Sequence, residues 1–242
     1  MEGDTAFVLF YWPLGFRANL IRGLLDFTGT PYTEGSTQEL VRLKGMSPKE
    51  AEALFMAPPL LYDRELDLYL AQASAIISHL STKLGMRPES LRKQSIGEKI
   101  VGDCGDILNE ITRGCGAQMW DQDSWEAFIS PGGRFEKWLL IFEQTARREG
   151  LQSDRGFFLG TETATFADTT VFGLLATMER SLPELSPLMR QHAPAVMALC
   201  DRLASNPGLE ALFKRLPERP YCGGMIEASL RKVISASATL SS

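Results

Sequence analysis

Few residues in this chain combine the chemical type and the spacing of a reactive site. Its four cysteines, at positions 104, 115, 200 and 222, show neither a CxxC pair nor a metal-ligand spacing, and only two histidines, His79 and His192, could assist them. We interpret the cysteines as reduced thiols and predict no metal site. Because the histidines are far apart and no nucleophile elbow is present, a Ser-His-Asp hydrolase has no support.

Tyr11 is the strongest remaining candidate because of its place in the chain. Phe7 to Phe10 is a short all-apolar run, typical of a strand that is buried on both faces. After a turn at Pro13, apolar residues repeat at helical spacing over residues 20–25. The pattern predicts a strand-turn-helix unit with Tyr11 at the carboxyl end of the strand, which is where open α/β sheets bind ligands.

The elements that position Tyr11 alternate between strand and helix. The tandem proline Pro58-Pro59 cannot lie inside a hydrogen-bonded ladder, so it marks the entry to a strand and indicates a cis bond. Further elements are predicted as a short strand around Tyr32, a brief helix over 49–55, a hairpin of strands over 60–62 and 66–70, and a helix with Ile76, Ile77, Leu80 and Leu84 on one face. The order β-α-β-α-β-β-α is that of a thioredoxin-like domain.

Everything beyond residue 94 is predicted to be helical. Residues 86–94 are polar and basic with Pro88 among them, and mark a domain boundary. Apolar residues then keep helical spacing around Phe135, Val171 and Val196, and a glycine-rich helix is expected over 96–119. Thr165 to Asp168 has the form of a capping box. The predicted fold is an α/β thioredoxin-like N-terminal domain over 1–86, an all-α helical bundle over 94–232 and a flexible tail over 233–242.

Composition excludes several classes of partner. The chain has 242 residues, 44% of them apolar, and a formal charge of −5, so it offers no electrostatic footprint for nucleic acid or an anionic membrane. The apolar runs are shorter than the roughly 18 residues of a transmembrane helix. These features predict a cytoplasmic protein that binds neither nucleic acid nor membrane.

Four local patterns, in this order and spacing, resemble the cytosolic glutathione transferase family. YWPLGFRANLIR is similar to the family's first strand and helix, and PPLLY to its cis-proline strand. QASAIISHLSTKLG resembles its glutamine-led third helix, and FLGTETATFADTTVF the entry to its buried sixth helix. The resemblance covers residues 7 to about 215.

The resemblance implies a role for Tyr11 in activating glutathione, the co-substrate. A free thiol with a pKa near 8.5 is mostly protonated at neutral pH and is a poor nucleophile. Tyr11 matches the family's tyrosine, whose hydroxyl donates a hydrogen bond to the bound thiolate. Arg17 matches the arginine near the same sulfur. Because no cysteine replaces Tyr11, the thiol-exchange chemistry of some relatives is not expected.

The tripeptide itself would be held at two further places. The resemblance makes Gln72 the residue that holds the γ-glutamyl group, but Ala73 stands where the family has a serine, and Ser74 replaces that hydroxyl only if the turn shifts. If Pro59 is the cis proline, Pro58 has no N–H for the family's backbone pairing; if Pro58 is the cis residue, Ala57 makes the pairing.

The remaining site residues are also implied by the resemblance. Lys44 or Lys49 would bind the glycyl carboxylate, and Asp103, or alternatively Asp106, would reach the γ-glutamyl amine across a dimer. The electrophile would lie over Tyr11, in a site lined by Leu14, Phe16, Arg113, Cys115 and Trp120.

The expected function is therefore conjugation of the glutathione thiolate to an apolar electrophile, a detoxification reaction, by a cytoplasmic homodimer. Two rivals remain. One is a non-catalytic structural or ligand-binding protein of the same fold. In such a protein, Pro58 and Ala73 would differ from the family pattern because the glutathione site no longer has to support catalysis. The other is a glutathione-dependent isomerase or a biosynthetic enzyme that forms carbon–sulfur bonds.

Overall fold

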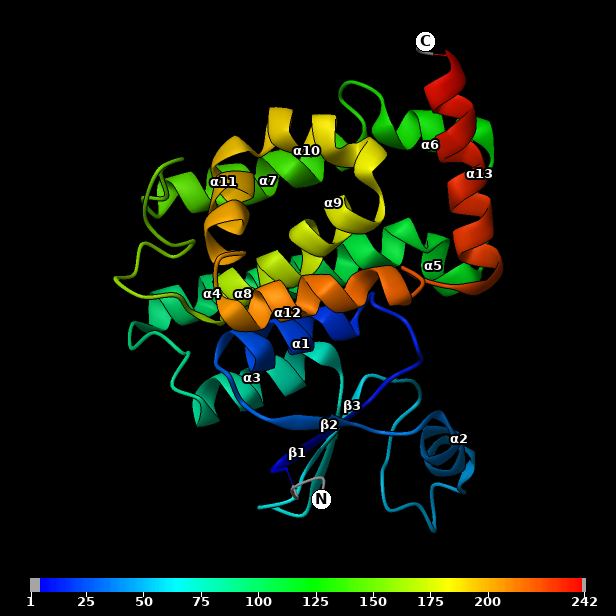
Figure 1. Ribbon diagram of the computed structural model, residues 1–242, viewed down its shortest axis with the longest axis vertical. Helices are drawn as coiled ribbons and strands as arrows, with labels where there is room; N and C mark the ends of the chain where they lie inside the picture. Colours follow the sequence, from blue (N-terminus) through cyan, green and yellow to red (C-terminus); the bar gives the residue numbers. More distant parts are fainter. Residues whose placement is uncertain (1–4, 241–242) are drawn as a thin grey trace.

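A four-stranded mixed sheet forms the N-terminal end of the molecule (Figure 1). The computed structural model describes residues 5–240, and the strand order across the sheet is β2-β1-β3-β4. Strand β1 (Phe7–Phe10) runs parallel to β2 (Tyr32–Glu34) and antiparallel to β3 (Leu60–Asp63), which pairs with β4 (Leu68–Ala71). All four residues of β1 are buried, as predicted, and Tyr11 follows the carboxyl end of the strand.

Three helices cover the two faces of this sheet. Phe7 and Leu9 of β1 pack in the core formed with helices α1 (Ala18–Phe27) and α3 (Ala73–Lys83). Val8 and Phe10 point to the other face and pack against α2 (Thr37–Gly45). The period-two alternation of a strand thus gives β1 a helix layer on each side.

The predicted helix over 49–55 is wrong, because residues 46–57 form turns and bends and the helix lies earlier, at α2. The Ser36 hydroxyl accepts the Glu39 backbone N–H at 3.1 Å, and Leu40 and Leu43 on the next turn are buried. The hairpin was predicted correctly, but its second strand starts at Leu68 because Asp67 adopts a left-handed turn conformation with φ 49°.

The rest of the described chain is helical, as expected. Its elements are α4 (Leu91–Ile111), α5 (Arg113–Gly116), α6 (Gln122–Ile129), α7 (Arg134–Arg148), α8 (Phe166–Val171), the π-helical turn η1 (Phe172–Ala176), α9 (Thr177–Ser181), η2 (Pro183–Leu185), α10 (Ser186–His192), α11 (Pro194–Leu203), α12 (Pro207–Arg215), η3 (Leu216–Glu218) and α13 (Gly224–Leu240). Within residues 5–240, no helix has the length and apolarity needed to cross a bilayer.

The glycine-rich helix expected over 96–119 ends earlier than predicted, at Ile111 in α4. Residues 113–116 have φ values of 49°, 69°, 56° and 86°, so α5 is one left-handed turn. We call residues 113–116 the left-handed turn. Gly114 and Gly116 adopt this conformation easily, whereas Arg113 and Cys115 hold it at a cost.

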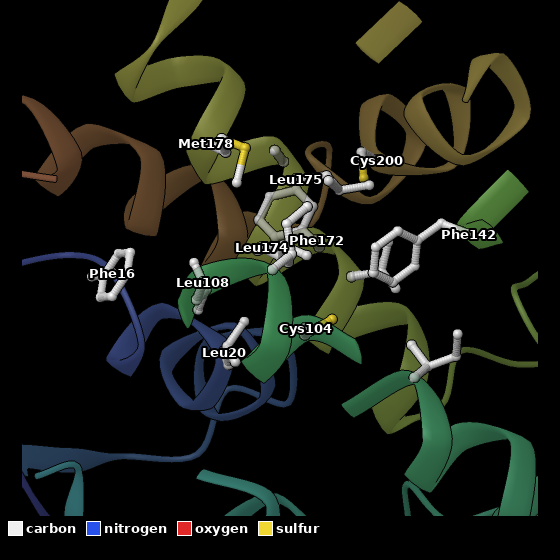
Figure 2. Packing of buried hydrophobic residues seen from close by; sticks show 14 of the residues in the cluster. Phe16, Leu20, Cys104, Leu108, Phe142, Phe172, Leu174, Leu175, Met178 and Cys200 are labelled. Atoms are coloured by element: carbon white, nitrogen blue, oxygen red, sulfur yellow. The ribbon is translucent and has the colours of Figure 1, made fainter. Parts of the chain in front are cut away.

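Helix α1 joins the sheet to the helical bundle. A Cβ added at Gly173 of η1 would lie 2.4 Å from the carbonyl oxygen of Asn19, and one at Gly23 would lie 2.9 Å from that of Thr169. These two glycines therefore allow the backbones of α1 and α8–η1 to touch. Figure 2 shows the adjoining core, in which Leu20 of α1 lies next to Cys104 and Leu108 of α4.

The capping box at the start of α8 is confirmed. The Asp168 carboxylate accepts the Thr165 backbone N–H at 2.8 Å and the Phe158 backbone N–H at 2.7 Å. Asp168 is fully buried, and burial raises its pKa above the usual value of a carboxyl group. Its side chain thus connects the start of α8 to the loop that precedes it.

The C-terminal segment expected to be flexible is instead helical through residue 240. Helix α13 continues past Val233 and Ile234, which are both buried, so apolar packing orders this part of the chain. Residues 241–242 of the predicted tail lie outside the described residues. The division into domains at residues 86–94 stays a prediction; the corresponding connection runs from the end of α3 to the start of α4.

Candidate active site

A cavity of about 460 Å³ lies beside the N-terminus of α3, between the loop before β3 and helices α1 and α4. We call it the Gln72 cavity. Seven residues singled out in the sequence line it together: Arg17, Ala57, Pro58, Pro59, Gln72, Ala73 and Ser74. In the described part of the chain, Arg17 is the only charged residue of this lining.

Gln72 holds an unusual backbone conformation at the edge of the cavity. Its φ of 70° and ψ of 117° are costly for a residue that is not glycine. The residue immediately precedes α3, and its side chain makes no capping hydrogen bond to that helix. The first N–H groups of α3, with the positive end of the helix dipole, are therefore available to an anion in the cavity.

The open question about the two prolines has a direct answer in the backbone. The peptide bond between Pro58 and Pro59 is cis, so Pro59 is the cis proline of the pair. Pro58 lines the cavity with a carbonyl group but has no N–H. The backbone of Pro58 can therefore accept a hydrogen bond from a bound peptide but cannot donate one.

Two glycines of α4, which were not predicted as site residues, form the opposite wall. A Cβ added at Gly102 or Gly105 would meet no atom within 4 Å, so both positions open onto free space. In sequence they read only as residues that weaken a helix. Their spacing of three residues, which places them on one helix face, was the available signal.

Tyr11 lies next to this cavity rather than in its lining. Its side chain is 6% exposed, and burial raises the pKa of its hydroxyl to about 12. The nearby Arg17 charge and a hydrogen bond from the Arg17 backbone lower that pKa but do not offset burial. Tyr11 is therefore protonated at neutral pH and can donate a hydrogen bond.

Arg17 connects the Tyr11 hydroxyl to the cavity. It precedes the first residue of α1, and its guanidinium donates to the Gly105 carbonyl at 3.4 Å and to the Cys115 sulfur at 3.7 Å. The Cys115 thiol in turn donates to the Asn109 side chain at 3.4 Å. The Cys115 sulfur thus lies beside Arg17, the cation that was predicted to lie near the glutathione sulfur.

Arg22, which was not predicted as a site residue, holds the loop that leads from Tyr11 to Arg17. It is 1% exposed and donates to both Glu34 carboxylate oxygens, at 2.7 and 3.0 Å. It also donates to the carbonyls of Leu14 and Gly15, at 2.9 and 3.2 Å. An arginine among the apolar residues of α1 was the signal, because a buried charge requires partners.

The predicted electrophile residues do not form one site. Leu14 and Phe16 pack against the segment before α13: the Gly15 N–H donates to Pro220, and the rings of Phe16 and Tyr221 meet edge to face at 5.4 Å. Arg113 and Trp120 line a different cavity, and Cys115 lies between the two groups. Tyr221, which was also not predicted as a site residue, has a buried hydroxyl with no hydrogen-bond partner among the described residues.

Three predicted ligands lie away from the Gln72 cavity. Lys44 is at the exposed end of α2, and Lys49 is in an exposed turn. Asp103 forms an ion pair with Lys99 on α4. None of the three lines the cavity. Among the described residues, no group of three potential metal ligands comes together.

Fold and site together define a thioredoxin-like domain that shares a cavity with a helical bundle, and comparison with known proteins identifies the family. A family model described as the C-terminal domain of glutathione S-transferase matches residues 96–233. Because this match spans more than half of the chain, the protein belongs to the glutathione S-transferase family.

Individual relatives agree with this assignment. A glutathione S-transferase of Plasmodium falciparum is 27% identical over 199 residues, which cover 78% of this chain and 89% of that protein. A Pi-class glutathione S-transferase of Onchocerca volvulus has a similar structure, with a TM-score of 0.70, 20% identity and coverage of 90% and 98% of the two chains. A glutathione S-transferase of Ascaris lumbricoides gives a TM-score of 0.65, 19% identity and coverage of 88% and 97%.

Proposed function

We propose that the protein conjugates glutathione to an apolar electrophile and that Tyr11 activates the thiol. The observation that carries this proposal is the contact between Tyr11 and Arg17 at the edge of the Gln72 cavity. A thiolate bound there would accept a hydrogen bond from the Tyr11 hydroxyl and would lie beside the Arg17 charge. Both interactions favour the anion over the thiol and so lower the thiol pKa.

The cavity residues support binding of the tripeptide in one orientation. The N-terminus of α3 suits a carboxylate of the γ-glutamyl group, with the Gln72 amide beside it. The Pro58 carbonyl suits the N–H of the cysteinyl unit, which places the sulfur toward Arg17. Holding the nucleophile in this way reduces the entropic cost of bringing the two reactants together.

A Tyr11→Phe substitution tests the role of the hydroxyl. We expect the apparent pKa of the bound thiol to rise by about one unit or more, because one donor to the thiolate is lost. Conjugation of a generic aryl halide should slow at neutral pH, whereas glutathione affinity should change little. The pKa is read from the pH dependence of kcat/KM and from thiolate absorbance in the enzyme–glutathione complex.

Measurements on the Tyr11→Phe variant and on the parent protein distinguish the candidate functions. An unchanged pH–rate profile in the Tyr11→Phe protein would remove Tyr11 from the mechanism. Tight glutathione binding by the parent protein, without turnover of aryl halides, epoxides or enones, would instead support the non-catalytic function. Isomerisation of a substrate without net consumption of glutathione would support the isomerase.

Exposed apolar residues support the homodimer that we propose with this function. Leu54 and Met56, on the loop before the cis proline, are 73% and 86% exposed. Large apolar side chains at such exposure are typical of an interface between chains. Light scattering coupled to size exclusion measures the assembly state, and a monomer at micromolar concentration would contradict it. We further propose a cytoplasmic location and a detoxification role.

A further inference from the structure

The loop between β1 and α1 lies beside a segment from the other end of the chain (Figure 1). This β1–α1 loop begins at Tyr11 and ends at Arg17, and residues 219–223, which we call the η3–α13 segment, join η3 to α13. The Gly15 N–H of the loop donates to the Pro220 carbonyl of the segment at 3.0 Å. The segment therefore contacts the backbone that connects the two residues that we propose to act on the thiol.

Phe16 makes the conformation of the β1–α1 loop depend on its surroundings. Its φ of 42° lies in the left-handed region, which costs free energy for a residue that is not glycine. Its side chain is buried, and its ring meets the Tyr221 ring of the η3–α13 segment edge to face at 5.4 Å. A strained residue keeps its conformation only where neighbouring contacts hold it. Because Arg17 directly follows Phe16, release of the segment would let Phe16 relax and would displace Arg17.

Glu34 on β2 connects the loop to the same segment through two arginines. Its carboxylate accepts from Arg22 Nε and Nη2 at 2.7 and 3.0 Å, and from Arg219 Nη1 at 3.2 Å. Arg22 also holds the loop, through the carbonyls of Leu14 and Gly15. Burial raises the pKa of Glu34, but the hydrogen bonds and charges of the two arginines outweigh burial and hold that pKa below its usual value. The carboxylate is therefore ionised at neutral pH and binds both arginines.

Arg219 can be removed without leaving a buried charge unpaired. The Arg22 side chain is 1% exposed, so a substitution of Glu34 would leave that buried charge without a carboxylate partner. The Arg219 side chain is 24% exposed, and the ion pair between Arg22 and Glu34 does not depend on it. The described lining of the Gln72 cavity does not include Arg219. Its loss would thus release the η3–α13 segment while the cavity lining stays the same.

We propose that Arg219 is a positioning residue for the thiol site. By holding the η3–α13 segment on Glu34, it keeps the β1–α1 loop in the conformation that directs Tyr11 and Arg17 at the same sulfur atom. Arg219 lies outside the cavity lining, so it acts through these two side chains. This inference rests on the proposed function and deepens it, because it names what holds the thiol-activating residues in place.

Arg219→Met tests the proposal, with Lys214→Met as the matched control. Lys214 is an exposed residue of α12 that pairs with Glu210 of the same helix at 2.7 Å. We expect Arg219→Met to raise the thiol pKa of bound glutathione by about half a unit to one unit, because both thiolate partners are less well placed. Conjugation of an aryl halide below that pKa should slow by about three- to tenfold. The control should leave both quantities unchanged.

The thiol pKa is read from thiolate absorbance in the glutathione complex and from the pH dependence of kcat/KM. Arg219→Lys retains the charge, and we expect it to restore most of the lost rate. The glutathione dissociation constant, measured by calorimetry, should stay within about threefold of the parent value in Arg219→Met, because no lining residue changes. Thermal unfolding establishes that each variant is folded, and Arg219→Gln repeats the test if the methionine variant does not fold.

Two further measurements show whether Arg219 acts through the loop. Hydrogen exchange, followed by mass spectrometry, should be faster in the peptide that contains the Gly15 N–H of Arg219→Met and unchanged in the control. In a protein that already carries Tyr11→Phe and Arg17→Met, Arg219→Met should change the thiol pKa by less than about 0.2 unit. The residues through which it acts are then absent.

Three results would overturn the proposal. The first is a thiol pKa in folded Arg219→Met equal to that of the parent. The second is an equal rise in Lys214→Met, and the third is an undiminished rise in the protein that lacks the Tyr11 hydroxyl and Arg17. The proposed function fails separately, if Tyr11→Phe leaves the pH–rate profile unchanged. Hydrogen exchange then decides the inference: unchanged exchange of the loop in Arg219→Met overturns it, and faster exchange supports it.

Discussion

At the residue scale, Ala73 bears on the anion binding that we propose at the start of α3. It is the first residue of the helix and lines the Gln72 cavity, but its methyl group donates no hydrogen bond. Ser74, one residue later, also lines the cavity and has a hydroxyl. The γ-glutamyl carboxylate that we propose here would therefore accept hydrogen bonds from backbone N–H groups of α3 and, among these two side chains, only from the Ser74 hydroxyl.

Ala73→Ser should tighten glutathione binding by about tenfold or more, because it adds one hydrogen bond to a charged group. Isothermal titration gives the dissociation constant, and Ser74→Ala is the matched control. If Ser74 already supplies the hydroxyl, the control weakens binding and Ala73→Ser adds little. No change in either variant would contradict placement of the γ-glutamyl group at this helix.

The structure brings together some of the site residues predicted from the sequence and separates others. Seven of the candidates meet in the Gln72 cavity, because their motifs lie at fixed points of a known strand and helix order. Lys44 and Lys49 do not meet there, since they sit in a segment whose helix was misplaced. The contact between Arg17 and Cys115 joins residues 98 positions apart, and no local pattern could predict it.

At the element scale, Asp63 ties the end of β3 to helix α3. Its carboxylate accepts from Lys83 Nζ at 2.8 Å and lies 2.8 Å from His79 Nε2. Burial raises the pKa of Asp63, but the hydrogen bonds from Lys83 and His79 outweigh burial and hold that pKa below its usual value. The start of α3 borders the Gln72 cavity, so this tie helps to position the site.

Asp63→Asn should lower the free energy of unfolding at pH 7 by about 2 kcal/mol. The lowered pKa means that the folded state favours the carboxylate, so its contribution is present above the unfolded pKa of about 3.9 and is lost as pH falls through the lower folded pKa. The difference between parent and variant should therefore shrink as the pH falls below about 4. Urea unfolding at several pH values measures it.

An exposed aspartate provides the control for this experiment. Asp154→Asn changes a side chain in the exposed loop after α7 and should alter the free energy of unfolding little at any of these pH values. A constant difference between parent and Asp63→Asn from pH 7 to pH 3 would contradict the role that we assign to ionisation of Asp63.

Elements were easier to predict than their ends. The buried strand β1, the hairpin and the helices of the second half follow from hydrophobic periodicity. Helix α2 was misplaced because only Leu40 and Leu43 of its nine residues are buried, which leaves a weak apolar pattern. The Ser36 cap was the better signal. The left-handed turn was read as helix because Arg113 and Cys115 rarely adopt positive φ.

At the scale of the whole molecule, the sheet and the bundle meet where α1 crosses α8 and η1. Gly173→Ala should lower the free energy of unfolding by about 1–3 kcal/mol, because the added methyl group would meet backbone atoms that cannot move aside. Thermal and urea unfolding measure the loss. Gly102→Ala is the control: it faces open space on α4 and should be neutral or slightly stabilising.

A stability loss in the control as large as that in Gly173→Ala would contradict the close-approach argument. The sequence predicted both halves of this fold but not the contact between them. Glycines inside apolar helices show where a backbone approach is possible, but not which helix approaches. That information came only with the three-dimensional arrangement of α1 and η1.

The close approach of α1 and η1 at Gly23 and Gly173 also limits which hybrids of this chain with its relatives can fold. A hybrid that keeps the crossing of this chain, with its sheet half or its bundle taken from a relative, needs a small residue on both sides of that crossing. A mismatch of one methyl group would push α1 away from the bundle and move Arg17, which α1 carries, with it. Recombination of this chain with a relative is thus expected to be restricted by Gly23 and Gly173, neither of which lines the Gln72 cavity.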